Sequence, residues 1–94
     1  MAWAFIIHET SDSVGVAVMD LEARARARGR FQHSDGEVQI EAIDPIPLGH
    51  KIAVVDIPEG ERVVEYGVLI GRATRAIRAG EHVHTHNLKG ERWA

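Results

Sequence analysis

Short apolar runs separated by polar turns dominate the chain. Residues 5–8 and 14–19 are apolar segments rich in Ile and Val, and residues 38–43 place apolar side chains at alternate positions. A period of two is typical of half-buried strands. No long segment repeats apolar residues at helical spacing, and residues 20–28 are the best candidate for one or two helical turns. The pattern predicts a mainly β fold with short strands.

A seven-residue pattern recurs along the chain. Residues 57–63 are echoed at residues 77–83 and, more loosely, at residues 46–52. In each copy an apolar residue closes one strand, a glycine follows three positions later, and another apolar residue opens the next strand. Glycine adopts positive φ without steric cost, so we expect tight connections of one type. Chance similarity between common turn signals is the alternative.

Length and composition narrow the class of protein. Ninety-four residues are expected to form one small domain, whose limited core would gain stability from a partner. Aromatic residues are only 5%, so the core is expected to be aliphatic, and the net charge of −3 gives no general case for nucleic-acid binding. The absence of cysteine excludes disulfides, iron–sulfur ligation and cysteine nucleophiles. We expect a cytoplasmic protein, because neither a secretory signal nor a membrane span is visible.

The most unusual local feature is the alternation of His82, His84 and His86. On a strand, residues two apart share a face and lie about 6.6 Å apart, so two neighbours can bind one metal ion. Three on a straight strand span about 13 Å, which is too far for a single ion unless the strand bends. At least one would then bind a substrate carboxylate or act as general acid or base, and a metal would need further ligands. Three solvated histidines are the remaining alternative.

Gly49, His50 and Lys51 form a second candidate site. They follow the end of a strand and precede the apolar run 52–55, so His50 and Lys51 are expected at a strand's edge. A lysine there can hold a carboxylate as a compact charge. An exposed turn without a ligand is the alternative.

A run of arginines interleaved with small residues covers positions 24–30. As a strand it would place every arginine on one face, where like charges repel. As a helix it would pair Glu22 with Arg26. A solvated face is the favoured interpretation, and a nucleic-acid role lacks interleaved aromatic residues. The glycines of residues 66–71 do not form a dinucleotide-binding motif, and no P-loop is present.

Three motifs, at residues 46–53, 65–73 and 80–88, together resemble the SAF-like N-terminal domain of the altronate and galactarate dehydratase family. They read Gly-His-Lys followed by Ile-Ala, then Tyr-Gly with Ile-Gly three residues on, then Val-His-Thr-His-Asn. The resemblance runs from about Asp12 to Leu88, with residues 21–37 matching poorly. The two ends of the chain are similar to the small subunit in the sulfolactate sulfo-lyase branch.

The resemblance implies a β-clip fold, with the large catalytic domain carried by a separate subunit. It implies β-elimination of water or sulfite from a small anionic hydroxy-acid, and a divalent metal, Fe²⁺ or Mn²⁺, held mainly by that large subunit. Carried over by motif, His50, Lys51, His84 and His86 are the catalytic candidates, and Tyr66, Arg72 and Asn87 are the substrate-binding candidates. The alternating spacing makes His82, His84 and His86 the metal candidates.

One residue departs from the family pattern. The family usually has lysine before the Tyr-Gly pair, and this chain has Glu65. If the family lysine holds an anion, this protein would bind a different group at position 65. Otherwise the position would have a purely structural role. A non-catalytic module that binds or positions a carbohydrate or sugar acid is the alternative function, and a homo-oligomer of the isolated chain is left open.

Overall fold

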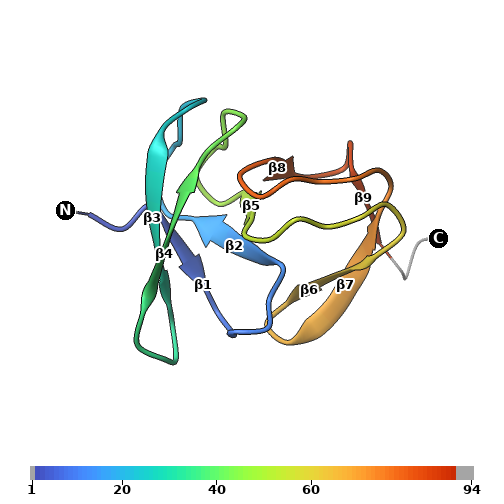
Figure 1. The fold of residues 1–94 in the computed structure, drawn as a ribbon, viewed down its shortest axis with the longest axis horizontal. Helices are drawn as coiled ribbons and strands as arrows, with labels where there is room; N and C mark the ends of the chain where they lie inside the picture. Colours follow the sequence, from blue (N-terminus) through green and yellow to red (C-terminus); the bar gives the residue numbers. More distant parts are fainter. Residues whose placement is uncertain (1, 91–94) are drawn as a thin grey trace.

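The computed structural model describes residues 2–90, and this part of the chain folds into nine short strands without a helix (Figure 1). The mainly β fold class is therefore confirmed. No helix in the described range is long and apolar enough to cross a membrane. In chain order the strands are β1 (Phe5–Ile7), β2 (Val14–Ala17), β3 (Arg26–Phe31), β4 (Glu37–Glu41), β5 (Lys51–Ala53), β6 (Arg62–Glu65), β7 (Val68–Ala73), β8 (His82–Val83) and β9 (Leu88–Gly90).

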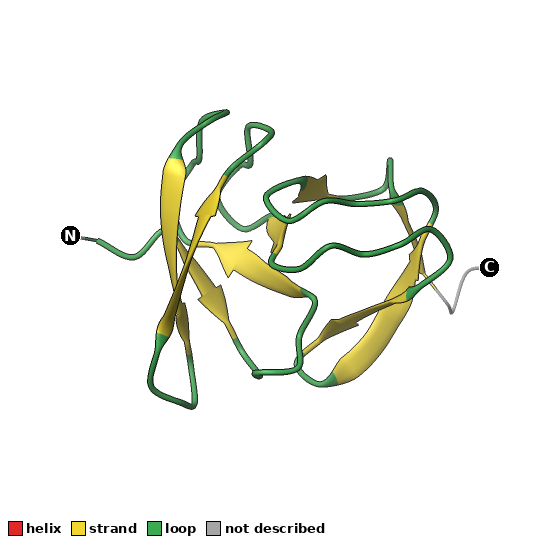
Figure 2. Ribbon diagram, in the orientation of Figure 1, coloured by secondary structure: helices red, strands yellow, loops and turns green. Residues whose placement is uncertain are grey.

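The strands form two sheets (Figure 2). Six strands make one sheet in the order β4-β3-β1-β2-β5-β8, and three make the other in the order β6-β7-β9. Strands β1 and β3 run parallel, whereas the other pairs are antiparallel. In Figure 1, β3 and β4 lie at one end of the molecule and β6, β7 and β9 at the other, with β5 and β8 between them.

Two aliphatic clusters form the core, and β5 contributes to both. Ile52 packs in the cluster that surrounds Phe5, and Ala53 packs in the cluster that contains Val63 and Ile77. Successive side chains of a strand point to opposite faces, so both faces of β5 are covered. Ile52 and Ala53 are fully buried. This burial fixes the strand that begins at Lys51, directly after His50.

The repeat is confirmed as one turn used three times. In each copy the third turn residue is a glycine with positive φ, as in a type II turn. The N–H of the next residue donates to the carbonyl three residues earlier. The glycines are Gly49 (φ 87°), Gly60 (φ 84°) and Gly80 (φ 98°), and the hydrogen bonds are His50 to Pro47 at 3.0 Å, Glu61 to Pro58 at 3.1 Å and Glu81 to Arg78 at 3.0 Å.

The helical turns expected at residues 20–28 are wrong. The segment contains a turn with Arg24 at a φ of 71° and then enters β3, which pairs with both β1 and β4. Ala27 is buried, and a Cβ at Gly29 would lie 2.0 Å from the ring of Phe5. The small residues between the arginines therefore let a strand pack against that ring, and long-range pairing decides the structure of this segment.

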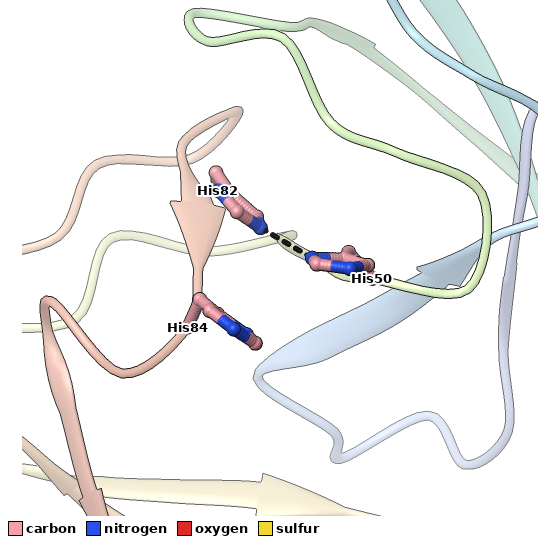
Figure 3. Close-up of side chains that lie close together, drawn as sticks. All are labelled: His50, His82 and His84. Atoms are coloured by element: carbon pink, nitrogen blue, oxygen red, sulfur yellow. Dashed lines mark hydrogen bonds between the residues drawn. The ribbon is translucent and has the colours of Figure 1, made fainter.

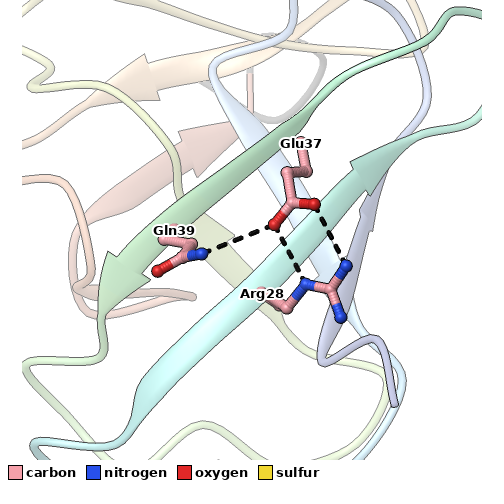
Figure 4. Close-up of polar contacts among 3 residues, drawn as sticks. All are labelled: Arg28, Glu37 and Gln39. Carbon is pink, nitrogen blue, oxygen red and sulfur yellow. Dashed lines mark hydrogen bonds and ion pairs between the residues drawn. The ribbon is translucent and has the colours of Figure 1, made fainter. Parts of the chain in front are cut away.

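The arginines of β3 lie on its outward side. Arg26 and Arg30 are exposed, and the half-buried Arg28 donates to both carboxylate oxygens of Glu37, at 2.9 and 3.0 Å (Figure 4). Gln39 donates to the same carboxylate at 3.5 Å. The hydrogen bonding between Arg28 and Glu37 lowers the pKa of Glu37 and raises the pKa of Arg28. An ion pair across two strands thus relieves part of the repulsion among these cations.

Candidate histidine site

The pairing of β5 with β8 brings the two histidine motifs together. The antiparallel register places Lys51 opposite Val83 and Ile52 opposite His82. His50 directly precedes β5 and His84 directly follows β8, so both residues lie at the end of this pairing. Because residues two apart on a strand share a face, His82 and His84 lie on the same side as His50.

Three imidazole rings meet at this point. His50 Nδ1 and His82 Nε2 share a hydrogen bond of 2.9 Å, and the ring centroids of His50 and His84 are 4.8 Å apart. The rings of His82 and His84 are nearly parallel, with centroids 5.4 Å apart. Figure 3 shows His82 and His84 projecting from the region of β8 toward His50, which comes from the segment before β5. One ring nitrogen from each of the three histidines lies within 4.8 Å of the others.

The chain bends within the three alternating histidines and does not follow a straight strand. Strand β8 ends at Val83, and the chain then turns, with the N–H groups of Asn87 and Leu88 donating to the carbonyl of His84 at 3.1 and 2.9 Å. The turn keeps His86 close, with its ring centroid 5.4 Å from that of His82. The donor atoms that gather most closely nevertheless come from His50, His82 and His84, and His86 is not among them.

Asn87 holds this turn in place. Its side chain is fully buried, its Oδ1 accepts the N–H of His84 at 2.9 Å, and its Nδ2 donates to the carbonyl of His82 at 2.8 Å. The family motif makes Asn87 a substrate-binding candidate. In this structure its amide instead fixes the backbone of the two histidines.

A carboxylate that sequence analysis did not single out also supports the cluster. Asp44 Oδ2 accepts the backbone N–H of His82 at 3.0 Å. Burial lowers the pKa of His82, and the nearby charges of His50, His86 and His84 lower it further, whereas Asp44 acts in the opposite direction. The neutral form of His82 is therefore favoured. Asp44 precedes Pro45 in a loop, and no local pattern connects it with a strand almost forty residues later.

Lys51 shares a hollow with His84 and is paired with Glu65. Lys51 Nζ is 3.7 Å from a carboxylate oxygen of Glu65, which is buried at the end of β6. Both residues line an open hollow of about 340 Å³, together with His84, Thr85 and apolar side chains. The residue that departs from the family pattern thus balances the lysine of the Gly-His-Lys motif.

Tyr66 lies outside the histidine cluster. It occupies the two-residue turn between β6 and β7 with a φ of 58°, and the backbone N–H groups of Tyr66 and Gly67 donate to Asp12 at 2.9 Å each. Its exposed ring stacks on His8 at a centroid distance of 3.7 Å, and His8 in turn hydrogen-bonds Gln32. This polar group lines a separate hollow of about 450 Å³.

Arg72 also lies outside the cluster. It is an exposed residue of β7, between Arg62 of β6 and Lys89 of β9 in the register, and it donates to the carbonyl of Gly60 at 3.2 Å. The structure therefore brings together His50, His82, His84 and, at the margin, His86, and it places Lys51 in the hollow that His84 also lines. It does not bring Tyr66 or Arg72 among them.

Residues 3–91 match the altronate/galactarate dehydratase SAF domain family. The chain is 45% identical over 94 residues to (2R)-sulfolactate sulfo-lyase subunit alpha of Chromohalobacter salexigens, which covers 99% of this chain and 100% of that one. It is 41% identical over 86 residues to altronate dehydratase of Bacillus subtilis, covering 92% of this chain and 16% of that one. It is 39% identical over 77 residues to galactarate dehydratase (L-threo-forming) of Escherichia coli, covering 82% of this chain and 13% of that one.

The chain therefore belongs to the altronate/galactarate dehydratase SAF domain family. It spans the whole of the sulfo-lyase alpha subunit but only 16% of the B. subtilis altronate dehydratase. The resemblance drawn from the three motifs is confirmed. The family match runs from residue 3 to residue 91 and so extends beyond the expected range from Asp12 to Leu88 at both ends.

Proposed function

We propose that this chain is the small subunit of a two-subunit lyase that eliminates a leaving group from a hydroxy-acid, with sulfolactate as the first substrate to test. The observation that carries the proposal is the 45% identity over the full length of a sulfo-lyase alpha subunit. The dehydratase relatives are much longer, since this chain covers 16% of one and 13% of another. By analogy with the alpha subunit that the chain matches over its whole length, the large catalytic part would be a separate chain.

The histidine cluster is the part of this chain that would complete the shared site. β-Elimination removes a proton beside a carboxylate and expels water or sulfite. Imidazole can accept or donate a proton near neutral pH, and His84 is exposed beside an open hollow. His50 and His82 are half-buried and hydrogen-bonded to one another, which suits orienting His84 and the substrate.

Lys51 would contribute a positive charge to the same hollow. Its ammonium group can attract a substrate carboxylate, and Glu65 at 3.7 Å offsets part of that charge. The Glu65 carboxylate is fixed by burial, whereas Lys51 is partly exposed. Lys51 can therefore turn toward an arriving anion while Glu65 stays in place.

The divalent metal of the proposed enzyme, Fe²⁺ or Mn²⁺, would be held mainly by the large subunit. A metal ion bound near a carboxylate stabilises the negative charge that develops after proton loss. The imidazoles of this chain fit such an ion, since iron accepts histidine ligands. His84, which is exposed, is the ligand best placed to reach an ion at the interface.

The proposal is tested by reconstitution. The neighbouring reading frame is first checked for a large subunit, the chain is co-expressed with the large subunit found, and turnover of sulfolactate, altronate and galactarate is measured. The lone chain should be inactive, and His84→Ala or His86→Ala should lower kcat of the complex by about 10²- to 10⁴-fold, the range for loss of an acid–base group. His33→Ala is the matched control, because His33 is exposed in the β3–β4 connection, away from the cluster.

Two results would overturn the proposal. Full activity in the His84→Ala and His86→Ala complexes would remove the catalytic assignment. Calorimetry showing that the lone chain binds a sugar acid independently of metal, while the complex has no lyase activity, would establish the non-catalytic binding module instead.

A further inference from the structure

Three imidazoles converge here on a framework that one chain supplies entirely. His50 directly follows Gly49, the turn glycine of the first copy. His82 lies two residues after Gly80, the turn glycine of the third copy, and His84 follows the end of β8. The donor nitrogens of the three lie within 4.8 Å of one another. His50 and His82 are 32 residues apart in sequence, and the pairing of β5 with β8 brings them together.

The framework holds the backbone of these histidines firmly. The N–H of His82 donates to Asp44, and the buried amide of Asn87 bonds the carbonyl of His82 and the N–H of His84. Strand β5, directly after His50, is buried on both faces. Preorganised ligands are the main structural requirement for a metal site, because little ordering is left for the ion to impose.

We propose that His50, His82 and His84 form a three-histidine site for a divalent transition-metal ion, carried by this chain alone. Nitrogen ligands at about 2.0–2.1 Å from a tetrahedral ion lie roughly 3.3 Å from one another. The His50–His82 pair, at 2.9 Å, is already close to this separation. His84 is exposed, so its ring can rotate to bring in the third nitrogen.

The donor set determines which ions fit. Imidazole suits Zn²⁺, Co²⁺, Ni²⁺ and Fe²⁺, whereas Mg²⁺ and Ca²⁺ require oxygen ligands. Three neutral histidines leave the full positive charge on the ion and one coordination position open. A ligand that supplies an anionic oxygen could bind at this open position. Of the three histidines, His84 also lines the hollow that contains Lys51 and Thr85.

The proposal does not rest on the lyase assignment, because the site needs no second chain. The full chain, purified without a polyhistidine tag, is titrated with Co²⁺ and Zn²⁺ at pH 7.5. Visible absorption reports the coordination of Co²⁺, and calorimetry gives the stoichiometry and Kd for Zn²⁺. We expect one ion per chain, the intense d–d bands of tetrahedral Co²⁺, and no binding of Mg²⁺.

Variants separate this donor set from the alternating histidines of the sequence. His50→Ala, His82→Ala and His84→Ala should each weaken Zn²⁺ binding by at least about tenfold. The control variant His33→Ala should bind as the parent chain does, and His86→Ala should bind more tightly than any of the three ligand variants. Circular dichroism checks that each variant is folded, and His→Gln replacements of similar size serve where alanine unfolds the chain.

Four results would overturn the proposal. One is the absence of Zn²⁺ and Co²⁺ binding at millimolar concentration. A second is one ion for every two chains, which would mean a bridging site. A third is unchanged Zn²⁺ binding in His50→Ala together with loss of binding in His86→Ala. This would mean that the ligands are the alternating histidines His82, His84 and His86. The last is equal loss in His33→Ala, which would indicate adventitious binding. None of these depends on turnover, so a failed lyase assay leaves the result intact.

Discussion

The protonation of His82 depends on residues from three segments of the chain. Burial and the charges of His50, His86 and His84 lower its pKa, and the carboxylate of Asp44 opposes them. Between the lowered pKa and the ordinary value of 6.5, the unfolded chain binds more protons at this residue than the folded chain does. The stabilising contribution of neutral His82 is therefore complete above pH 6.5 and is lost as the pH falls through the lowered pKa.

In metal-free protein, the ring resonances of His82 should titrate in NMR spectra with a midpoint below 6.5. Asp44→Asn should move this midpoint lower still, because it removes a negative charge that favours the imidazolium form. Asp35→Asn is the control, since Asp35 is an exposed residue of the β3–β4 connection. A midpoint at or above 6.5, or no response to Asp44→Asn, would contradict the electrostatic account of the site.

The repeated turn shows how an element places a functional residue. Its second copy ends at Gly60, which lies in open space, whereas its third copy packs Gly80 against the carbonyl of Glu41. The N–H of Gly80 donates to Ala53, and its carbonyl accepts from Ile43. The third turn is therefore docked between β4 and β5, and this docking sets the position of His82 two residues later.

Gly60→Ala and Gly80→Ala make a matched pair of replacements. Both glycines have positive φ, so each alanine should cost about 1–2 kcal/mol of backbone strain. At Gly80 a Cβ would also lie 2.2 Å from the carbonyl oxygen of Glu41, whereas at Gly60 it would meet nothing within 4 Å. We expect Gly80→Ala to lose at least about 1–3 kcal/mol more than Gly60→Ala, as in other overpacked sites. Urea denaturation measures both, and equal losses would contradict the docked turn.

Local pattern predicted much at the scale of elements. The alternation of residues 38–43 and the three turn glycines needed only neighbours in sequence, and the strand and turns lie where expected. The helical turns at 20–28 failed because Phe5 and the ladders of β1 and β4 decide that segment. The motifs identified the histidines of the site but not their arrangement in space. That arrangement depends on the pairing of β5 with β8 and on the buried amide of Asn87, which local sequence does not reveal.

At the scale of the molecule, the histidine cluster sits on an exposed face. The hollow beside His84 is open, and the chain offers few walls to keep water from a reacting substrate. Enzymes that handle charged intermediates exclude water from their sites. A chain of 94 residues also has a limited core, so association would stabilise it. Chemistry and stability thus both favour a partner that covers this face.

Chemical modification of histidines tests directly whether a partner covers the face that contains His84. Diethylpyrocarbonate reacts with accessible neutral imidazoles, and mass spectrometry resolves each modified residue. In the lone chain, His84 and His33 are both exposed and should both react. On complex formation with the large subunit, the rate at His84 should fall by about tenfold or more, as a protected site opens only transiently. The rate at His33 should stay the same. Equal reactivity of His84 in the chain and in an active complex would mean that the partner covers another face, and the shared site would have to lie elsewhere.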